Sequence, residues 1–357
     1  MSDHEFNDLT LDHVKFYVDG LPDKVSRLSD AYGLGVYATS GFPDDRVSHA
    51  YSVSLGAGRI RFVLSEAQTQ DHPGRAYVQA HGYGVSDIAI RTDDAWLTFT
   101  EALRRGARPV AEPTARDGMV TAAIAGFGDV VHTLVERSAG LDGRALPGAT
   151  LVDRPAPSPG VGLGTIDHFA VCVEAGQLDP TVSFYRDTLG FRAIFEERII
   201  VGEQAMHSKV VQCQDGTITF TVIEPDTSRE PGQIDEFLKN HGGAGVQHIA
   251  LTSNDIVSSI DALRSNGVEP LDTPDSYYDL LPDRIDLSKH SVEDLRRLNV
   301  MVDEDHDGQL FQIFTRSAHP RRTFFFEIIE REGATTFGSG NIKALYEAVE
   351  FEHAGSE

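Results

Sequence analysis

The stretch Ile166-Asp167-His168-Phe169-Ala170-Val171-Cys172-Val173 has a counterpart near the start of the chain, Leu11-Asp12-His13-Val14-Lys15-Phe16-Tyr17-Val18. The two stretches lie 155 residues apart, and each carries an Asp-His pair at the same place. In both, apolar side chains recur with a period of two, which is typical of a β-strand with one buried face. A strand repeated in this way indicates a duplicated unit.

Other repeats support the duplication, at spacings that change along the chain. The similar pairs are Gly84–Ile90 with Gly245–Leu251, Glu101–Arg104 with Asp261–Arg264, and Thr133–Arg137 with Glu327–Arg331. The spacing is 161 for the first of these pairs and 194 for the last. We therefore expect about 33 additional residues in the second copy, within 270–325.

The order of elements is clearest in the second copy. After the first strand, the pattern predicts a helix near Thr181–Leu189 that ends at Gly190, then strands near Ile199–Val201, Ser208–Gln212 and Thr217–Ile223. A second unit follows, with a strand at 247–252, a helix near Ile256–Asn266 capped by Asn254 or Asp255, and a closing strand through Phe324–Ile329. This order predicts an α+β fold of tandem β-α-β-β-β modules, with helices on one side of curved mixed sheets.

These patterns divide the chain into two similar domains. We expect one domain at 1–140, a linker at 141–163 rich in proline and glycine, and a second domain at 164–357. A final helix at 341–351 is amphipathic, because its apolar residues recur at helical spacing. We expect this helix to act as a lid.

Composition excludes several classes of function. The chain has 357 residues, 31 Lys and Arg, and 55 Asp and Glu, which gives a formal charge of −24. Such a surface repels nucleic acids and anionic membranes. No apolar run is long enough to span a bilayer, and because Met1–Glu5 is acidic and no apolar stretch follows it, we expect no signal peptide. Two cysteines do not make a disulfide framework, so we expect a cytoplasmic protein. The oligomeric state stays open, a homo-oligomer included.

Three positions of the second copy form a candidate metal site. His168, His248 and Glu327 stand where the first copy has His13, Asp87 and Thr133, and each lies on an expected strand. Two imidazoles and one carboxylate are the ligand set of the facial triad that binds non-haem Fe(II). Histidines on strands are often structural. A metal is a good partner for a buried carboxylate at 327, and a buried arginine is the main alternative. Spacing alone leaves both interpretations open.

Other motifs do not lead to a function. Asp303-x-Asp305-x-Asp307-Gly308 resembles the start of a calcium loop, but the twelfth position is Phe314 instead of glutamate. An acidic turn is the better interpretation. The cysteines lack zinc-site spacing, and no glycine-rich phosphate loop follows a strand.

The C-terminal half resembles the 4-hydroxyphenylpyruvate dioxygenase family of the vicinal oxygen chelate superfamily. The matching stretches are Ile166–Ala170, Gly245–Ala250, Gln312–Thr315, Phe325–Arg331 and Phe337-Gly338-x-Gly340-Asn341. The resemblance implies that His168, His248 and Glu327 bind Fe(II), that 4-hydroxyphenylpyruvate and dioxygen are the substrates, and that the first domain is structural.

The same resemblance implies a set of residues around the substrate. Polar pocket residues would be Ser208, Gln233 and Gln312, with Phe314, Phe325 and Phe337 packing against the aromatic ring. Gln247 and Asn341 would support the ligands and the pocket from behind. Each of these residues also has a purely structural interpretation, since most of the 19 phenylalanines must lie in the core.

Two departures from the family pattern concern the product. Members that attack the aromatic ring and yield homogentisate typically have Pro-x-Asn-Glu-Pro on a strand of the site, where this chain has Thr221-Val222-Ile223-Glu224-Pro225. They also have Gly-Asn-Phe before the last helix, where this chain has Gly340-Asn341-Ile342. Both departures are similar to the members that hydroxylate the benzylic carbon and yield 4-hydroxymandelate. The homogentisate-forming activity and a non-catalytic ligand-binding protein remain alternatives.

Overall fold

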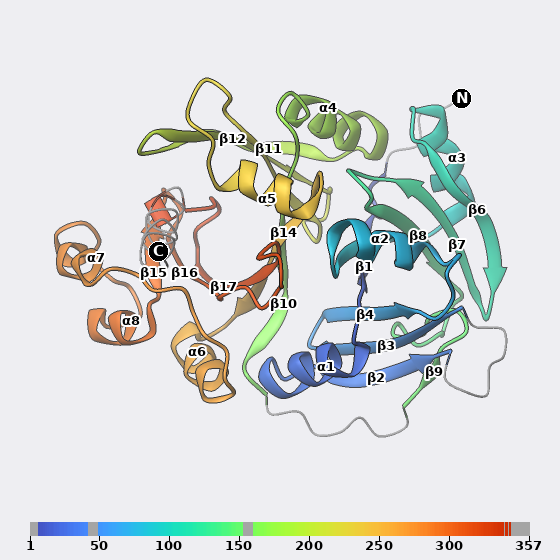
Figure 1. The fold of residues 1–357 in the computed structure, drawn as a ribbon, viewed down its shortest axis with the longest axis horizontal. Coiled ribbons are helices and arrows are strands. Elements are labelled where there is room, and N and C mark those ends of the chain that lie inside the picture. Colours follow the sequence, from blue (N-terminus) through green and yellow to red (C-terminus); the bar gives the residue numbers. More distant parts are fainter. Residues whose placement is uncertain (1–5, 42–48, 153–159, 339, 342, 344–357) are drawn as a thin grey trace.

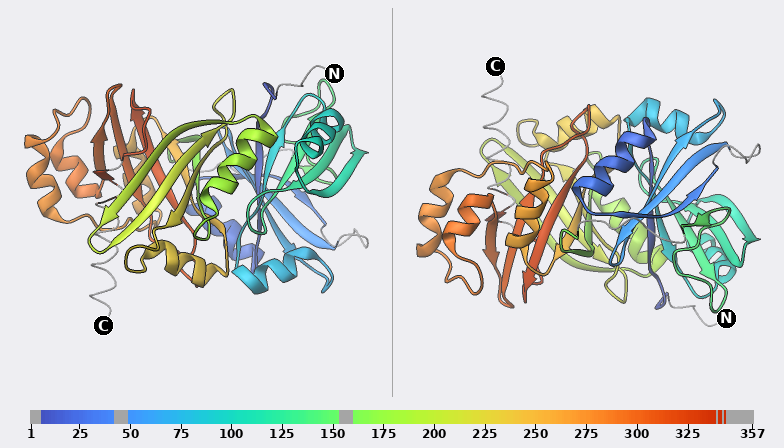
Figure 2. Two further views of the ribbon diagram at one scale, coloured as in Figure 1. Left: turned by 90° about the horizontal axis from the view of Figure 1, so that it is seen from above. Right: turned by 90° about the horizontal axis from the view of Figure 1, so that it is seen from below.

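The computed structural model describes residues 6–41, 49–152 and 160–338, together with 340, 341 and 343. Within these residues the strands form two mixed sheets that are separate along the chain (Figure 1). The first sheet extends from Thr10 to Leu151 and the second from Leu163 to Glu332. Figure 2 shows the sheets side by side, with helices packed against both. The expected α+β fold of tandem modules is confirmed.

The first sheet, as far as the chain is described, contains nine strands in the order β6-β7-β8-β5-β1-β4-β3-β2-β9. Their bounds are β1 Thr10–Tyr17, β2 Gly35–Ser40, β3 Ala50–Ala57, β4 Ile60–Ala67, β5 Gly84–Arg91, β6 Pro109–Arg116, β7 Met119–Ala125, β8 Val131–Arg137 and β9 Thr150–Leu151. The helices of this half are α1 (Leu21–Ser26, continued by a π-helical turn at Arg27–Ala31), α2 (Pro73–His81) and α3 (Ala95–Arg104).

The second sheet has the order β11-β12-β13-β10-β14-β17-β16-β15. Its strands are β10 Leu163–Cys172, β11 Arg192–Val201, β12 Gln204–Gln212, β13 Thr219–Pro225, β14 Gly245–Ser253, β15 Met301–Glu304, β16 Gln309–Phe314 and β17 Phe325–Glu332. The accompanying helices are α4 (Leu178–Ser183), α5 (Gln233–His241), α6 (Ile256–Ser265), α7 (Asp275–Leu280) and α8 (Val292–Leu298).

Strand register confirms the duplication residue by residue. In the first sheet β1 lies between β4 and β5, and Lys15 is paired with Asp87. In the second sheet β10 lies between β13 and β14, and Ala170 is paired with His248. The next strands agree, since Asp87 is paired with Val131 and His248 with Phe325. Glu327 therefore occupies the position of Thr133.

The additional residues of the second copy are the segment that contains α7, a 3-10 turn at Leu281–Asp283, and α8. This segment follows α6, whereas in the first sheet α3 leads directly to β6. It lies at the outer end of the second sheet, beyond β15 and β16 (Figure 1). The expected location within 270–325 is confirmed.

Local expectations were met with some differences. The helix expected near Thr181–Leu189 begins at Leu178 and finishes as a π-helical turn at Phe184–Thr188, before Gly190 adopts φ 70°. Asp255 is the cap of α6, because its carboxylate accepts a hydrogen bond from the Ser258 amide at 3.0 Å.

The expected linker contains β9, which pairs with β2. Residues 153–159 and nearly all of the expected lid helix at 341–351 lie outside the described residues, so the domain division and the lid stay predictions.

An apolar core continues from one sheet to the other. Phe169 and Val171, on the face of β10 opposite His168, belong to the same buried cluster as Phe16 and Phe62. The rings of Phe62 and Phe326 stack with centroids 5.9 Å apart, so side chains of both sheets are in direct contact. No helix among the described residues is long and apolar enough to cross a membrane.

Histidine side chains form contacts between α2 and α5, one helix from each half of the chain. The rings of His81 and His241 stack at 4.4 Å between centroids, and His81 Nδ1 lies 2.8 Å from the His241 carbonyl oxygen. Beside them, His319 packs on the Tyr83 ring. Burial, helped by the nearby His81, lowers the pKa of His241 to about 4. Burial likewise lowers the pKa of His319 to about 4.

These two low pKa values predict a loss of stability in mild acid. A histidine whose pKa is lower in the folded state contributes stability above its unfolded pKa near 6.5, and the contribution is lost as pH falls toward 4. We expect each histidine to reduce the free energy of unfolding by about 2 kcal/mol between pH 7 and pH 5. His241→Gln should make the pH dependence in urea unfolding shallower by that amount. The exposed His306→Gln is the matched control and should leave the slope unchanged.

Candidate metal centre

Three adjacent strands bring His168, His248 and Glu327 together. β10, β14 and β17 are neighbours in the second sheet, and each contributes one of these residues. Glu327 Oε2 lies 3.2 Å from His168 Nε2 and 3.3 Å from His248 Nε2. The three possible ligand atoms all lie within 4.8 Å of one another. Among the described residues, no other group of three His, Cys, Asp or Glu side chains meets this condition.

Burial makes this arrangement costly without a positive partner for the carboxylate. Glu327 is 2% exposed, His168 5% and His248 8%. Burial alone would raise the pKa of Glu327, but the two imidazoles lower it to about 2. Burial would lower the pKa of His168, but Glu327 and Asp167 raise it to about 9. A divalent cation would take the place of that proton, since imidazoles bind metals in the neutral form. The donor set fits a non-haem iron.

An ion pair orients the His168 ring from behind. Asp167 Oδ1 lies 2.9 Å from His168 Nδ1 and accepts a hydrogen bond of 2.9 Å from Arg331 Nη2. Burial would raise the pKa of Asp167, but the bonds from Arg331 and His168 hold it below its ordinary range. With Nδ1 engaged, Nε2 is left to face the cluster. The first sheet repeats the device, because Arg137 donates to Asp12 and Asp12 lies 2.7 Å from His13 Nδ1.

This support predicts a measurable effect on metal affinity. Removing an outer hydrogen-bond partner of a metal-bound histidine typically reduces affinity or activity about 10–100-fold. We expect Asp167→Asn to weaken iron binding within this range, as measured by competition with a chelator. Asp12→Asn, the same change in the first sheet, is the control and should leave iron binding unchanged. Equal losses in both variants would contradict the role of Asp167.

Aromatic rings enclose the two histidines. Phe325 stacks on His248 with centroids 4.9 Å apart, and Phe314 approaches the same ring edge-on at 5.8 Å. Phe337 meets His168 edge-on at 5.2 Å. The structure therefore brings all three expected phenylalanines to the cluster. Whether they also pack against a substrate ring stays a prediction.

Polar atoms without a partner lie on the same side of the sheet. Thr221 is paired with Ala170, two residues beyond His168, and its Oγ1 is buried without a hydrogen-bond partner among the described residues. Gln233, the first residue of α5, has an Nε2 atom in the same condition. Ser208 is buried and lies opposite Ile223. Enclosed polar atoms of this kind are costly unless a ligand or water satisfies them.

Ile223 differs from the other expected pocket residues. It is 7% exposed and belongs to an apolar cluster with Cys172, Met206 and, from α5, Ile234 and Phe237. Its side chain is therefore packed as core, on the sheet face that carries His168. Any polar replacement at this position would have to be satisfied by a ligand or by water.

The remaining expected residues are Gln247, Gln312, Asn341 and Ile342. The buried amides of Gln312 and Asn341 are in contact at 3.3 Å, and the Tyr277 hydroxyl lies 3.1 Å from Asn341. Gln247 Oε1 lies 3.3 Å from His248 Nδ1, which is consistent with a supporting position. Ile342 lies outside the described residues.

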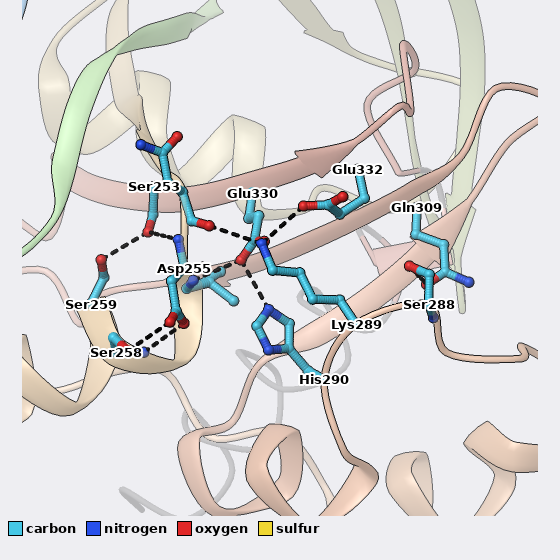
Figure 3. Close-up of polar contacts among 12 residues, drawn as sticks. Ser253, Asp255, Ser258, Ser259, Ser288, Lys289, His290, Gln309, Glu330 and Glu332 are labelled. Carbon is cyan, nitrogen blue, oxygen red and sulfur yellow. Dashed lines mark hydrogen bonds and ion pairs between the residues drawn. The ribbon is translucent and has the colours of Figure 1, made fainter.

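A buried network on the opposite face of β17 was not expected from the sequence (Figure 3). Glu330 is 2% exposed and accepts hydrogen bonds from the Ile256 amide at 2.7 Å and from Lys289, and His290 Nε2 lies 2.9 Å from it. The network joins the additional segment and α6 to the strand that carries Glu327. The first copy keeps part of it, because Glu136 accepts from the Ala95 amide at 3.0 Å.

Repetition was the signal that could have revealed these supports. The Asp-His pair and the Glu-Arg pair occur at the same places in both copies. The Asp167–Arg331 pair and the Glu330 anchor could have been inferred from this agreement. Lys289 and His290 lie in the segment unique to the second copy, where no comparison was possible.

The fold and the site define a class of protein, and comparisons with known proteins agree. Residues 165–313 match the Glyoxalase/Bleomycin resistance protein/Dioxygenase superfamily, and residues 36–145 match the N-terminal family of hydroxyphenylpyruvate dioxygenase. A mutant of 4-hydroxymandelate synthase from Streptomyces coelicolor is similar in structure, with a TM-score of 0.88, 39% identity and coverage of 97% of this chain and 99% of that chain.

Curated relatives are similar over nearly the whole chain. The 4-hydroxyphenylpyruvate dioxygenases of Yarrowia lipolytica and Aspergillus fumigatus are 32% and 36% identical, each over 96% of this chain and 92% of the relative. The chain belongs to the 4-hydroxyphenylpyruvate dioxygenase family. It is an iron-dependent dioxygenase of the vicinal oxygen chelate fold, and its His168–His248–Glu327 cluster is able to hold a metal ion.

Proposed function

We propose that the protein converts 4-hydroxyphenylpyruvate and dioxygen to 4-hydroxymandelate and CO2, with Fe(II) held by His168, His248 and Glu327. Ile223 is the observation that carries the choice of product. Its packed apolar side chain stands at the position where family members that attack the aromatic ring typically have asparagine. The structural similarity to a 4-hydroxymandelate synthase at 39% identity supports this choice.

Bound iron would supply the activation of dioxygen and hold the keto acid. The protein's own side chains position the substrate and keep water away. Asp167 and Arg331 orient the His168 ring, while Phe325 stacks on the His248 ring and limits the positions that this ring can take. The unpartnered Thr221 Oγ1 and Gln233 Nε2 would bind polar groups of the substrate. The phenylalanines would pack against its ring and exclude solvent.

Substrate orientation would decide which carbon reacts. A displacement on the order of 1 Å is enough to change the reacting atom. Ile223 offers no hydrogen bond, so it cannot hold a polar group or an ordered water near the ring, as an asparagine amide could. Ile342 in place of phenylalanine would alter the pocket further. The CH2 group of the substrate would then face the oxidant.

The homogentisate-forming reaction is the second candidate, and the curated relatives favour it by name. One experiment separates the two. The protein is loaded with Fe(II) without oxygen, mixed with 4-hydroxyphenylpyruvate, exposed to air, and its product is identified by mass and retention. We expect 4-hydroxymandelate as the main product. Homogentisate as the main product would replace this proposal with the alternative, and the absence of any oxygen consumption would favour a ligand-binding protein.

A further inference from the structure

A cavity of about 230 Å³ lies in the first sheet at the place that corresponds to the metal centre of the second. His13, Asp87 and Thr133, the counterparts of the three candidate ligands, all line it. Strand register extends the correspondence to the substrate side. Ser65, which also lines the cavity, is paired with Tyr17, just as Ile223 is paired with Cys172. The cavity is therefore the duplicated counterpart of the proposed substrate site.

This cavity is not built for a metal. Asp87 is already engaged, because it accepts hydrogen bonds from the Thr133 amide at 2.9 Å and from the Thr133 hydroxyl. Threonine in place of glutamate removes the anionic ligand. The described residues contain no cluster of three metal-binding side chains here. The support behind His13 is nevertheless intact, since Asp12 and Arg137 form a buried ion pair beside it.

Lys15 brings a positive charge to the cavity by another route. It occupies the position of Ala170 and lines the cavity together with Ser52 and Ser65. Within the described residues its ammonium has no hydrogen-bonded or ion-paired partner, and it lies over the Tyr17 ring, 4.9 Å from the centroid. Burial lowers the pKa of Lys15, while the charge of Asp87 opposes this effect. A partly buried ammonium without a hydrogen-bonded or ion-paired partner favours the binding of an anionic group.

We propose that this cavity binds a small organic acid, whose carboxylate pairs with the Lys15 ammonium. The serine hydroxyls of the wall would bind its other polar groups. The volume is below the range of about 300–1,000 Å³ typical of sites for drug-sized ligands, so the ligand is small. The excess negative charge of the chain does not attract anions from a distance, so recognition depends on the cavity itself. The site is independent of the reaction proposed for the second sheet.

Calorimetric titration of the iron-loaded protein with sodium lactate, sodium malonate and 4-hydroxymandelate, at constant ionic strength, tests this proposal. We expect at least one probe to bind at a site that persists in His248→Ala protein, in which the metal centre is disrupted. Lys15→Met should weaken this binding about tenfold or more, whereas Lys15→Arg should largely retain it.

A second variant guards against misfolding of the lysine variant. Ser65→Ile introduces the residue that the second copy carries at the equivalent place, so the strand should accept it while the cavity is filled. Melting curves establish that each variant is folded. Undiminished binding in both Lys15→Met and Ser65→Ile, or no metal-independent binding of any of the three probes to the unmodified protein, would overturn the proposal.

Discussion

Proteins with alanine at His168, His248 or Glu327 are expected to lose stoichiometric iron and to stop turning over 4-hydroxyphenylpyruvate. The three ligand atoms lie within 4.8 Å of one another, so each removal leaves only two side chains to hold the ion. The loss should exceed the roughly 10–100-fold effect typical of removing an outer partner of a ligand. Iron content by elemental analysis and oxygen uptake are the measurements.

Equivalent changes in the first sheet provide the control. Asp87 occupies the position of His248 in the duplicated unit, but it is hydrogen-bonded to Thr133 on a different sheet. The Asp87→Ala protein should therefore keep iron and turnover. Circular dichroism should show that all variants are folded. Full activity in His248→Ala, or loss of iron in Asp87→Ala, would contradict the assignment of the metal centre.

Under the proposed function, Ile223→Asn is expected to divert part of the product from 4-hydroxymandelate to homogentisate or to uncoupled 4-hydroxyphenylacetate. The change lies on β13, away from the three candidate ligands, so iron loading and loss of CO2 should continue. Only the later partition between ring and benzylic carbon should move. A difference of about 1.4 kcal/mol between the competing barriers shifts this partition tenfold. Product ratios per oxygen consumed are the measurement.

Stability must be measured alongside the product, because Ile223 is packed among apolar side chains. Placing an amide there should make the protein roughly 2–4 kcal/mol less stable. Val201→Asn is the matched control, since Val201 is 2% exposed in the same cluster. It should reduce stability without moving the product ratio. A product ratio unchanged in Ile223→Asn, or changed equally in both variants, would remove residue 223 from the control of specificity.

Sequence by itself determined the duplicated fold and the identity of the three candidate ligands. Side-chain periodicity is a local property of each strand, so the repeats could be aligned without knowing how the strands pair. The alignment then placed His168, His248 and Glu327 at the positions of His13, Asp87 and Thr133, and the strand register agrees with it. The additional segment was located in the same way, from the change in spacing alone.

Only the tertiary structure decided which polar groups are satisfied and which are left for a ligand. Thr221 Oγ1 and Gln233 Nε2 have no partner among the described residues, whereas Asp87 is bonded to Thr133. Such differences depend on contacts between segments far apart in the chain, and neither spacing nor residue type reveals them. The packing of Ile223 within an apolar cluster has the same origin. Lys15 looked like an ordinary strand residue in the sequence. The fold placed it in a second cavity beside His13 and Asp87, where its ammonium has no hydrogen-bonded or ion-paired partner among the described residues.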